Sequence, residues 1–214
     1  KSTLIKILSG VLYPDNGQVK VLNFTPWEDR IRYAQHLGVV FGQKSQLSWD
    51  LPAVDSFELN KGIYDISDRN YEKRLKLMVD LLDAKDFITK QVRQLSLGER
   101  MRCEIIQSLL HNPKIVFFDE PTIGLDIIAK EKVRDFIMEV NKKYGTTFIL
   151  TTHDMGDIEK LCERVIIINH GRVIYDGLLS DVRKKFANKK MIDCKFLEPI
   201  VPKPFEMKGC RTLI

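Results

Sequence analysis

Two short apolar runs in this sequence end in side chains that could do chemistry. Asp119 and Glu120 close the run KIVFFDE, and His153 closes a second run, TTFILTTH. At the carboxyl edge of a parallel sheet, one carboxylate can hold a hard cation such as Mg²⁺ while the other orients a water for attack. For the carboxylate pair alone an alternative stays open, namely a helix cap with a neighbouring surface acid.

The first three residues, Lys1, Ser2 and Thr3, stand directly before an apolar pattern with helical spacing. The apolar positions near one helix face are Leu4, Ile5, Leu8, Val11 and Leu12. A Lys-Ser pair at a helix start matches the end of a phosphate-binding loop, G-x-x-x-x-G-K-[ST], whose glycines would come just before residue 1. Alone, the triplet is also typical of a surface helix cap.

Composition limits the classes of protein. With 214 residues, 44% apolar and 29% charged, the chain suits one domain with a real core, or one domain with a small appendage. The net charge of +5 is spread along the chain, so no nucleic-acid partner is expected. The longest apolar runs fall far short of the roughly 20 residues of a membrane span, so any service to a membrane would come from the water side.

Cysteine spacing favours a reducing compartment. The four cysteines are Cys103, Cys162, Cys194 and Cys210. They form no C-x-x-C pair, which argues against a zinc site and against a secreted disulfide framework. We therefore expect reduced thiols in the cytosol.

Alternating helical and β-branched stretches predict an α/β fold. Helices are expected over 71–84, 98–113 and 128–144, and strands over 114–120 and 146–153. Strand, helix and strand in this order give a right-handed crossover and a parallel sheet. Further along, the pattern predicts a helix over 155–163, a hairpin within 164–177 around His170-Gly171, and a helix over 178–187.

The order of the motifs resembles the ATP-binding cassette (ABC) ATPase family. The matching segments are Lys1-Ser2-Thr3, Gln43, LSLGE (95–99), Asp119-Glu120, GLD (124–126) and His153. The resemblance implies a P-loop NTPase-type parallel sheet with an inserted α-helical signature subdomain at about 45–112 and a C-terminal β-hairpin. It implies a nucleotide-binding domain over 1–187 whose first part is missing, and the start of a C-terminal extension over 188–214.

The resemblance also implies roles for these residues, with ATP and Mg²⁺ as cofactors. Lys1 would neutralise the β and γ phosphates, Thr3 would face a phosphate, and Ser2 and Gln43 would ligate Mg²⁺. Asp119 would hold the Mg²⁺ through water. Glu120 would be the general base for hydrolysis, and His153 would contact the γ-phosphate.

The signature motif of the family acts across a dimer. Ser96 and Gly98, with Leu97 and Glu99, would bind the γ-phosphate held by a second ABC subunit, and Leu125 and Asp126 of the D-loop would cross the same interface. Leu97 and Glu99 replace the usual glycine and glutamine, while Ser96 and Gly98 are intact, so we expect a competent site. The alternative is that this segment only caps a helix, as serine with a nearby glutamate often does.

The resemblance implies that the loop glycines and an aromatic that stacks on adenine precede Lys1. Hydrogen bonds to charged groups contribute about 1.5–3 kcal/mol each, so lacking four such donors would remove roughly 6–12 kcal/mol. Micromolar binding is only about 8 kcal/mol in all. We therefore expect a polypeptide that begins at Lys1 to bind no ATP measurably, whereas the full-length protein would bind and hydrolyse it.

The segment after Gln43 resembles the region where transmembrane permease subunits dock. Leu47, Leu51 and Val54 have the apolar spacing usual there, and Trp49 and Phe57 offer aromatic surface unless they are core residues. VVFGQKSQLSWDLP looks most like ABC-2 type drug exporters. The leading expectation is thus an ATPase subunit that powers export from the cytoplasmic face of the membrane. The alternative is a soluble ABC ATPase that acts on ribosomes or DNA.

Overall fold

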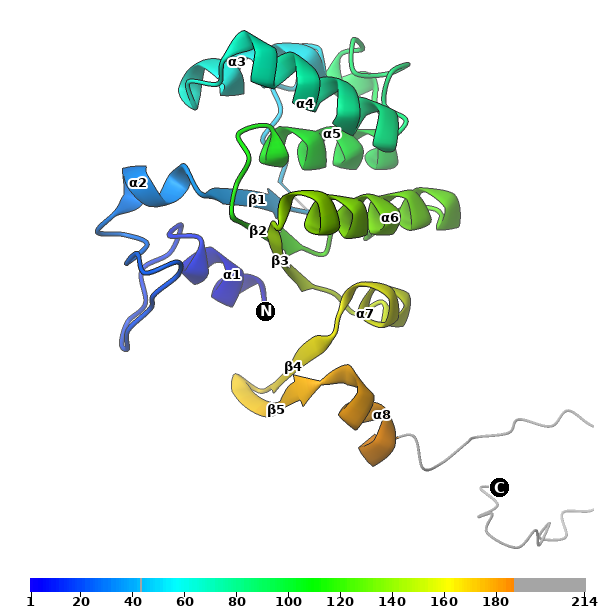
Figure 1. The fold of residues 1–214 in the computed structure, drawn as a ribbon. Coiled ribbons are helices and arrows are strands. Elements are labelled where there is room, and N and C mark those ends of the chain that lie inside the picture. The colour runs from blue at the N-terminus through cyan, green and yellow to red at the C-terminus, as the bar shows by residue number, and fades with distance from the viewer. Residues whose placement is uncertain (43, 187–214) are drawn as a thin grey trace, which may run out of the picture.

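The computed structural model describes residues 1–42 and 44–186. Figure 1 shows three parallel strands at the centre with helices on both sides, which confirms the predicted α/β class. In chain order the elements are α1 (Ser2–Leu8), α2 (Arg30–Ala34), β1 (Leu37–Phe41), α3 (Ala53–Ile63), α4 (Asp68–Leu81), the 3₁₀ helix η1 (Val92–Gln94), α5 (Leu97–Leu109), β2 (Ile115–Asp119), α6 (Ile127–Tyr144), β3 (Thr147–Thr151), α7 (Met155–Leu161), β4 (Arg164–Asn169), β5 (Arg172–Leu178) and α8 (Leu179–Phe186).

The central sheet has the order β1-β2-β3, and both pairings are parallel. Successive residues of β2 are buried against opposite layers because side chains alternate between the faces of a strand. Ile115 and Phe117 pack with Ile5 of α1, whereas Val116 and Phe118 belong to the larger core that α3 to α6 cover. Fully burying side chains of this size stabilises the fold by about 1.5–3 kcal/mol each.

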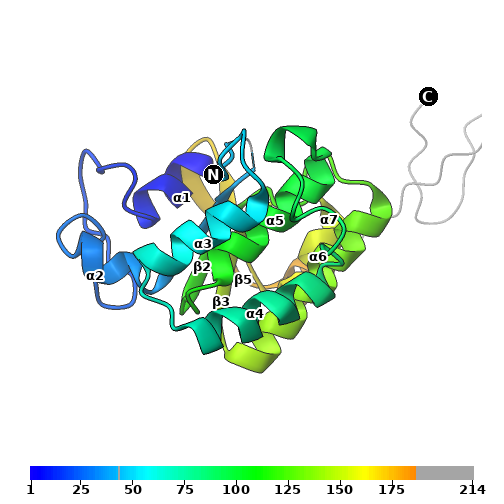
Figure 2. The same ribbon diagram turned by 90° about the horizontal axis from the view of Figure 1, so that it is seen from above.

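Helices α3, α4 and α5 lie together beyond the β1 side of the sheet (Figures 1 and 2). The expected helix over 71–84 is present as α4, which begins earlier, at Asp68, and ends at Leu81. The expected helix over 98–113 is present as α5 and ends at Leu109, since Asn112 has a positive φ and Pro113 cannot continue a helix.

The first helix is shorter than its apolar pattern predicts. It ends at Leu8, and the chain reverses at Gly10, whose φ is +75°. Val11 and Leu12 therefore lie outside the helix and are exposed. Periodicity over-extended this helix because the apolar spacing continues beyond the residue where the backbone turns.

Strand β3 is parallel as expected, but it is less buried than its apolar run predicts. Ile149 is 39% exposed. Among the described residues β3 pairs with β2 alone, so the opposite edge has no partner there. The difference is physical, since a parallel strand is fully buried only when both its edges and both its faces are covered.

The C-terminal hairpin is as predicted. β4 and β5 pair antiparallel around His170 and Gly171, with one register shift between Ile167 and Ile168, and α8 follows. The proposed extension over 188–214, with Cys194 and Cys210, lies outside the described residues. None of the helices in the described part has the length and apolar character needed to cross a membrane.

Candidate functional site

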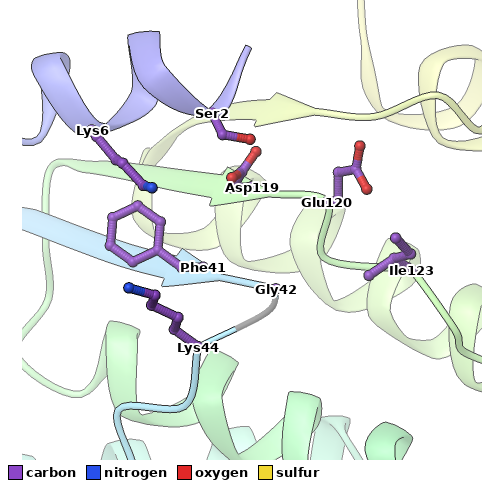
Figure 3. A pocket seen from close by; sticks show the side chains of 8 residues that line it. All are labelled: Ser2, Lys6, Phe41, Gly42, Lys44, Asp119, Glu120 and Ile123. Carbon is purple, nitrogen blue, oxygen red and sulfur yellow. The ribbon is translucent and has the colours of Figure 1, made fainter.

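A cavity of about 170 Å³ opens where β1 and β2 end and α1 begins. Figure 3 shows its walls, with Ser2 and Asp119 close together and Glu120 beside them. The residues that line it are Ser2, Lys6, Phe41, Gly42, Lys44, Asp119, Glu120 and Ile123. The carboxyl ends of parallel strands are the usual place for a ligand in an α/β fold.

Asp119 is the last residue of β2, and its carboxylate is held from the next strand. The Thr151 hydroxyl donates a hydrogen bond of 2.5 Å to Asp119 Oδ1, and the Gly42 amide donates one of 3.0 Å to the Asp119 carbonyl. The following helix, α6, is capped by Asp126 instead. The alternative interpretation of Asp119 as a helix cap is therefore wrong.

Glu120 has a φ of +57°, in the left-handed region that a side chain makes costly. Its amide donates to the Thr151 carbonyl at 3.0 Å. The Nδ1 atom of His153 lies 3.3 Å from Glu120 Oε1, and both side chains are accessible. The geometry thus brings together the two residues that the sequence analysis assigned to catalysis.

The three residues expected to end the phosphate-binding loop occupy different positions relative to the cavity. Ser2 lines the cavity, whereas Thr3 is exposed and outside the cavity wall. Lys1 Nζ donates to the carbonyl of Thr152, directly before His153, at 3.0 Å. Gln43 lies outside the described residues.

Two lysines in the cavity wall, Lys6 and Lys44, were missed by the sequence analysis. The signal for Lys6 was available, because it follows Ser2 by four residues and so lies on the same helix face. For Lys44, the signal in the sequence was limited to its position next to Gln43.

The signature segment begins α5 with a reciprocal cap. The Glu99 amide donates to Ser96 Oγ at 3.2 Å, and the Ser96 amide donates to Glu99 Oε2 at 2.8 Å. The Ser96 amide holds the pKa of the Glu99 carboxyl below its usual value. Ser96 is exposed, and a hydroxyl that accepts a bond keeps its own proton to donate. The cap and an outward-facing anion site are therefore compatible.

The D-loop packs against the signature segment of the same chain. Leu125 is buried, and a side chain added at Gly98 would meet it at ordinary contact distance. Gly124 has a φ of +70°, and a Cβ there would lie 2.5 Å from Leu97 Cδ2. Asp126, which is exposed, accepts from the Ala129 amide at 2.8 Å and so starts α6. The two segments expected at a dimer interface form one packed unit.

Phe57 is fully buried and is a core residue, whereas Trp49 is 53% exposed. Leu47 is buried too, Val54 is partly buried, and Leu51 is exposed. Of the aromatic residues considered for docking, Trp49 alone offers surface.

The donors at the cavity fit a magnesium ion. The Ser2 hydroxyl and the Asp119 carboxylate are hard oxygen ligands. In the described part of the chain, no group of three or more His, Cys, Asp or Glu side chains could hold a metal by itself. Two protein oxygens fit Mg²⁺, because that ion is usually bound through one or two protein side chains together with substrate phosphates and water.

A parallel sheet with a Lys-Ser helix start and a carboxylate pair at one edge defines a nucleotide-binding α/β domain. Comparisons with known proteins give the family, since the ABC transporter family profile matches residues 1–123. The chain belongs to the ABC transporter family, which confirms the resemblance of its motifs to ABC ATPases.

Relatives and solved structures agree. The ABC transporter ATP-binding protein NatA of Bacillus subtilis is 29% identical, over 85% of this chain and 74% of its own. The probable multidrug ATP-binding protein YbhF of Escherichia coli is 31% identical, and the match covers 90% of this chain but 33% of YbhF. The ATP-binding cassette MJ0796, solved as a dimer with ADP and Pi, is 28% identical with a TM-score of 0.74, over 83% of this chain and 80% of its own.

Proposed function

We propose that this chain is the ATP-hydrolysing part of an ABC transporter that exports a substrate through separate membrane subunits. The observation that carries the proposal is the cavity that Ser2, Asp119 and Glu120 share at the carboxyl end of the sheet. Membership of the family makes ATP the expected ligand of that cavity.

In this proposal Glu120 takes the proton from the water that attacks the γ-phosphate, a role typically worth about 10²- to 10⁴-fold. His153, within hydrogen-bonding distance of Glu120, contacts the γ-phosphate and responds to its loss. Lys1 would exchange its bond to the Thr152 carbonyl for the β and γ phosphates, to which it supplies a point charge. Thr3, which is next to Ser2 but outside the cavity wall, would face a phosphate at the rim.

Ser2 and Asp119 would hold Mg²⁺, and Gln43 would be a further ligand of the ion. When bound, the ion neutralises negative charge on the β and γ phosphates. The Thr151 hydroxyl keeps the Asp119 carboxylate oriented at 2.5 Å.

A second ABC subunit completes the proposed site. Ser96 and Gly98 begin α5, so the hydroxyl and the positive end of the helix can bind an anion brought by a partner. Leu97, Glu99, Leu125 and Asp126 would line the same interface. The relative MJ0796 forms a dimer with ADP and Pi, which supports this arrangement.

The exposed Trp49 and Leu51 support docking of transmembrane permease subunits, with this chain peripheral on the cytoplasmic face of the membrane. Export is favoured by relatives named for multidrug transport and daunorubicin resistance, at 31% and 30% identity. Methionine import proteins match at 28% and 32%, so the direction of transport needs its own experiment.

The experiment uses the full-length protein, reconstituted in liposomes with its membrane subunits. Glu120→Gln should lower ATP hydrolysis by about 100-fold or more, while ATP binding, measured by equilibrium dialysis, persists. The matched control is Glu139→Gln, because Glu139 is an exposed acid on α6 away from the cavity.

Equal hydrolysis in Glu120→Gln and in the control would reject Glu120 as the base. ATP-dependent movement of substrate away from the side that holds this chain would establish export. Movement toward that side would reject it.

A further inference from the structure

A buried carboxylate is hydrogen-bonded to residues that stand next to Glu120 and His153 in the chain. It belongs to Asp157 on α7, whose side chain is 1% exposed. Three side chains donate to it: Thr122 Oγ1 at 2.6 Å, Thr152 Oγ1 at 2.7 Å and Arg134 Nε at 2.7 Å. Burying a carboxylate is costly unless it has a cationic partner and hydrogen-bond donors, and Asp157 has Arg134 and two threonine hydroxyls.

The two threonines are close in sequence to the catalytic pair. Thr122 follows Glu120 by two residues, and Thr152 directly precedes His153. The Thr152 hydroxyl also accepts from the Asp154 amide at 2.9 Å, so it fixes the backbone on both sides of His153. A single oxygen, Asp157 Oδ2, accepts from both threonine hydroxyls. It therefore links the segment after Glu120 to the segment before His153.

The backbone at Glu120 needs such support. A φ of +57° is costly for a residue with a side chain, and such conformations persist only where surrounding contacts fix them. The turn that follows Glu120 is closed by a hydrogen bond from the Ile123 amide to the Glu120 carbonyl at 3.2 Å. The hydrogen bond from Thr122 to Asp157 anchors this turn and so supports the conformation of Glu120.

Arg134 makes the anchor rigid. Besides Asp157, its guanidinium contacts Glu131 at 2.6 Å and Asp154 at 3.3 Å. It therefore ties α6, which begins at the D-loop, to α7, which follows His153.

We propose that Asp157 is a positioning residue that holds Glu120 and His153 in their mutual geometry through the hydroxyls of Thr122 and Thr152. This inference rests on the proposed function, since it concerns the same ATPase site. The competing role is a purely structural strap between α6 and α7, which would affect stability but not the catalytic geometry.

The test compares Asp157→Asn and Thr122→Val with a matched control, Thr146→Val. Thr122 and Thr146 are each 2% exposed, and the hydroxyl of each donates a hydrogen bond. The acceptor of Thr146 is the Pro113 carbonyl, which precedes β2 and so lies at the end of the strand opposite to Glu120. In the full-length protein, kcat should fall about 10- to 100-fold in the first two variants, because small displacements of catalytic groups are costly. KM for ATP should stay within about twofold, and Thr146→Val should keep the wild-type kcat.

Hydrogen exchange supplies a measurement that does not depend on hydrolysis. The backbone amides of Glu120, Thr122, Ile123, His153 and Asp154 should exchange faster in Asp157→Asn and Thr122→Val than in Thr146→Val. A wild-type protein without ATPase activity would reject the proposed function, while the exchange pattern would still decide the role of Asp157. An unchanged kcat in Thr122→Val, with or without faster exchange, or equal losses in Thr146→Val, would overturn the proposal. If Asp157→Asn fails to fold, Thr122→Val decides alone.

Discussion

Two buried carboxylates, Glu104 in the helical region and Asp157 near the proposed catalytic pair, Glu120 and His153, are held in different ways. Asp157 is paired with Arg134. Glu104 on α5 accepts from the Ser45 hydroxyl at 2.5 Å and from the Gln46 amide at 2.9 Å. Among the described residues, no lysine or arginine forms an ion pair with Glu104.

The different partners have different electrostatic consequences. Burial raises the pKa of the Glu104 carboxyl, and the bonds from Ser45 and the Gln46 and Leu47 amides oppose it only in part. The segment that Glu104 holds also carries the exposed Trp49, over whose ring the Arg100 guanidinium lies at 5.8 Å. The proposed catalytic side is therefore fixed by a carboxylate paired with an arginine, whereas the proposed docking side is fixed by a carboxylate whose pKa is raised by burial.

The largest effect is expected at the paired carboxylate. Arg134→Met leaves the charge of Asp157 buried without a cation, which typically costs about 3–5 kcal/mol of unfolding free energy. Urea denaturation of the full-length protein measures the loss. Adding Asp157→Leu should recover part of it, because the buried charge is then gone. If Arg134→Met left the free energy of unfolding unchanged, the two carboxylates would not differ in this way.

A smaller loss is expected at Glu104. Glu104→Ala leaves the Ser45 hydroxyl and the Gln46 amide without their acceptor, at a cost of about 1–3 kcal/mol. Trypsin should cleave after Lys44 faster than in the wild type, since the segment loses its anchor. Glu139→Ala serves as the control, and equal cleavage rates in both variants would refute the role of Glu104.

A pH dependence should separate the two carboxylates further. Since the Glu104 pKa is raised above its ordinary 4.5, the folded state keeps a proton that the unfolded state releases just above that pH. The contribution of Glu104 to wild-type stability therefore falls as pH rises through this range. Glu104→Gln has no such group, so its stability relative to wild type should increase with pH from about 4.5 upward. Urea midpoints across this range measure the trend, and a relative stability that decreases with pH would contradict it.

The smallest effect is expected for an exposed ion pair. Lys132 contacts Asp83 at 2.6 Å, but their side chains are 38% and 70% exposed. Exposed pairs contribute little because water and salt screen them. Lys132→Gln should leave the urea midpoint unchanged within error, and a clear shift would mean that pairing matters here without burial.

Much of the fold could be predicted from sequence because its elements are locally consistent. The strand before Asp119, helix α6 and the hairpin around His170 all combine clear periodicity with turn residues at their ends. Helices α2 and α3 and strand β1 were not predicted. Strand β1, LGVVF, is short and contains a glycine, so its place in the sheet is decided by tertiary packing on β2.

The site was predictable where a motif marks it, and the residues that support it were not. Asp119, Glu120 and His153 stand at the ends of strands, and the structure brings them together. Asp157 lies on a short helix, where an acid ordinarily faces solvent. The burial of Glu104 could have been predicted from sequence, because most of the neighbouring positions of α5, from Cys103 to Leu109, are apolar or small.

The contact between Leu97 and Gly124 has a consequence for protein engineering. A Cβ at position 124 would meet the flexible end of the Leu97 side chain and would stand at a φ of +70°, so a cassette that receives LSLGE accommodates it with least strain when it has a glycine at the matching position. A larger residue there would force Leu97 into another rotamer and would strain the turn between β2 and α6. Leu97 and Gly124 are therefore best exchanged together.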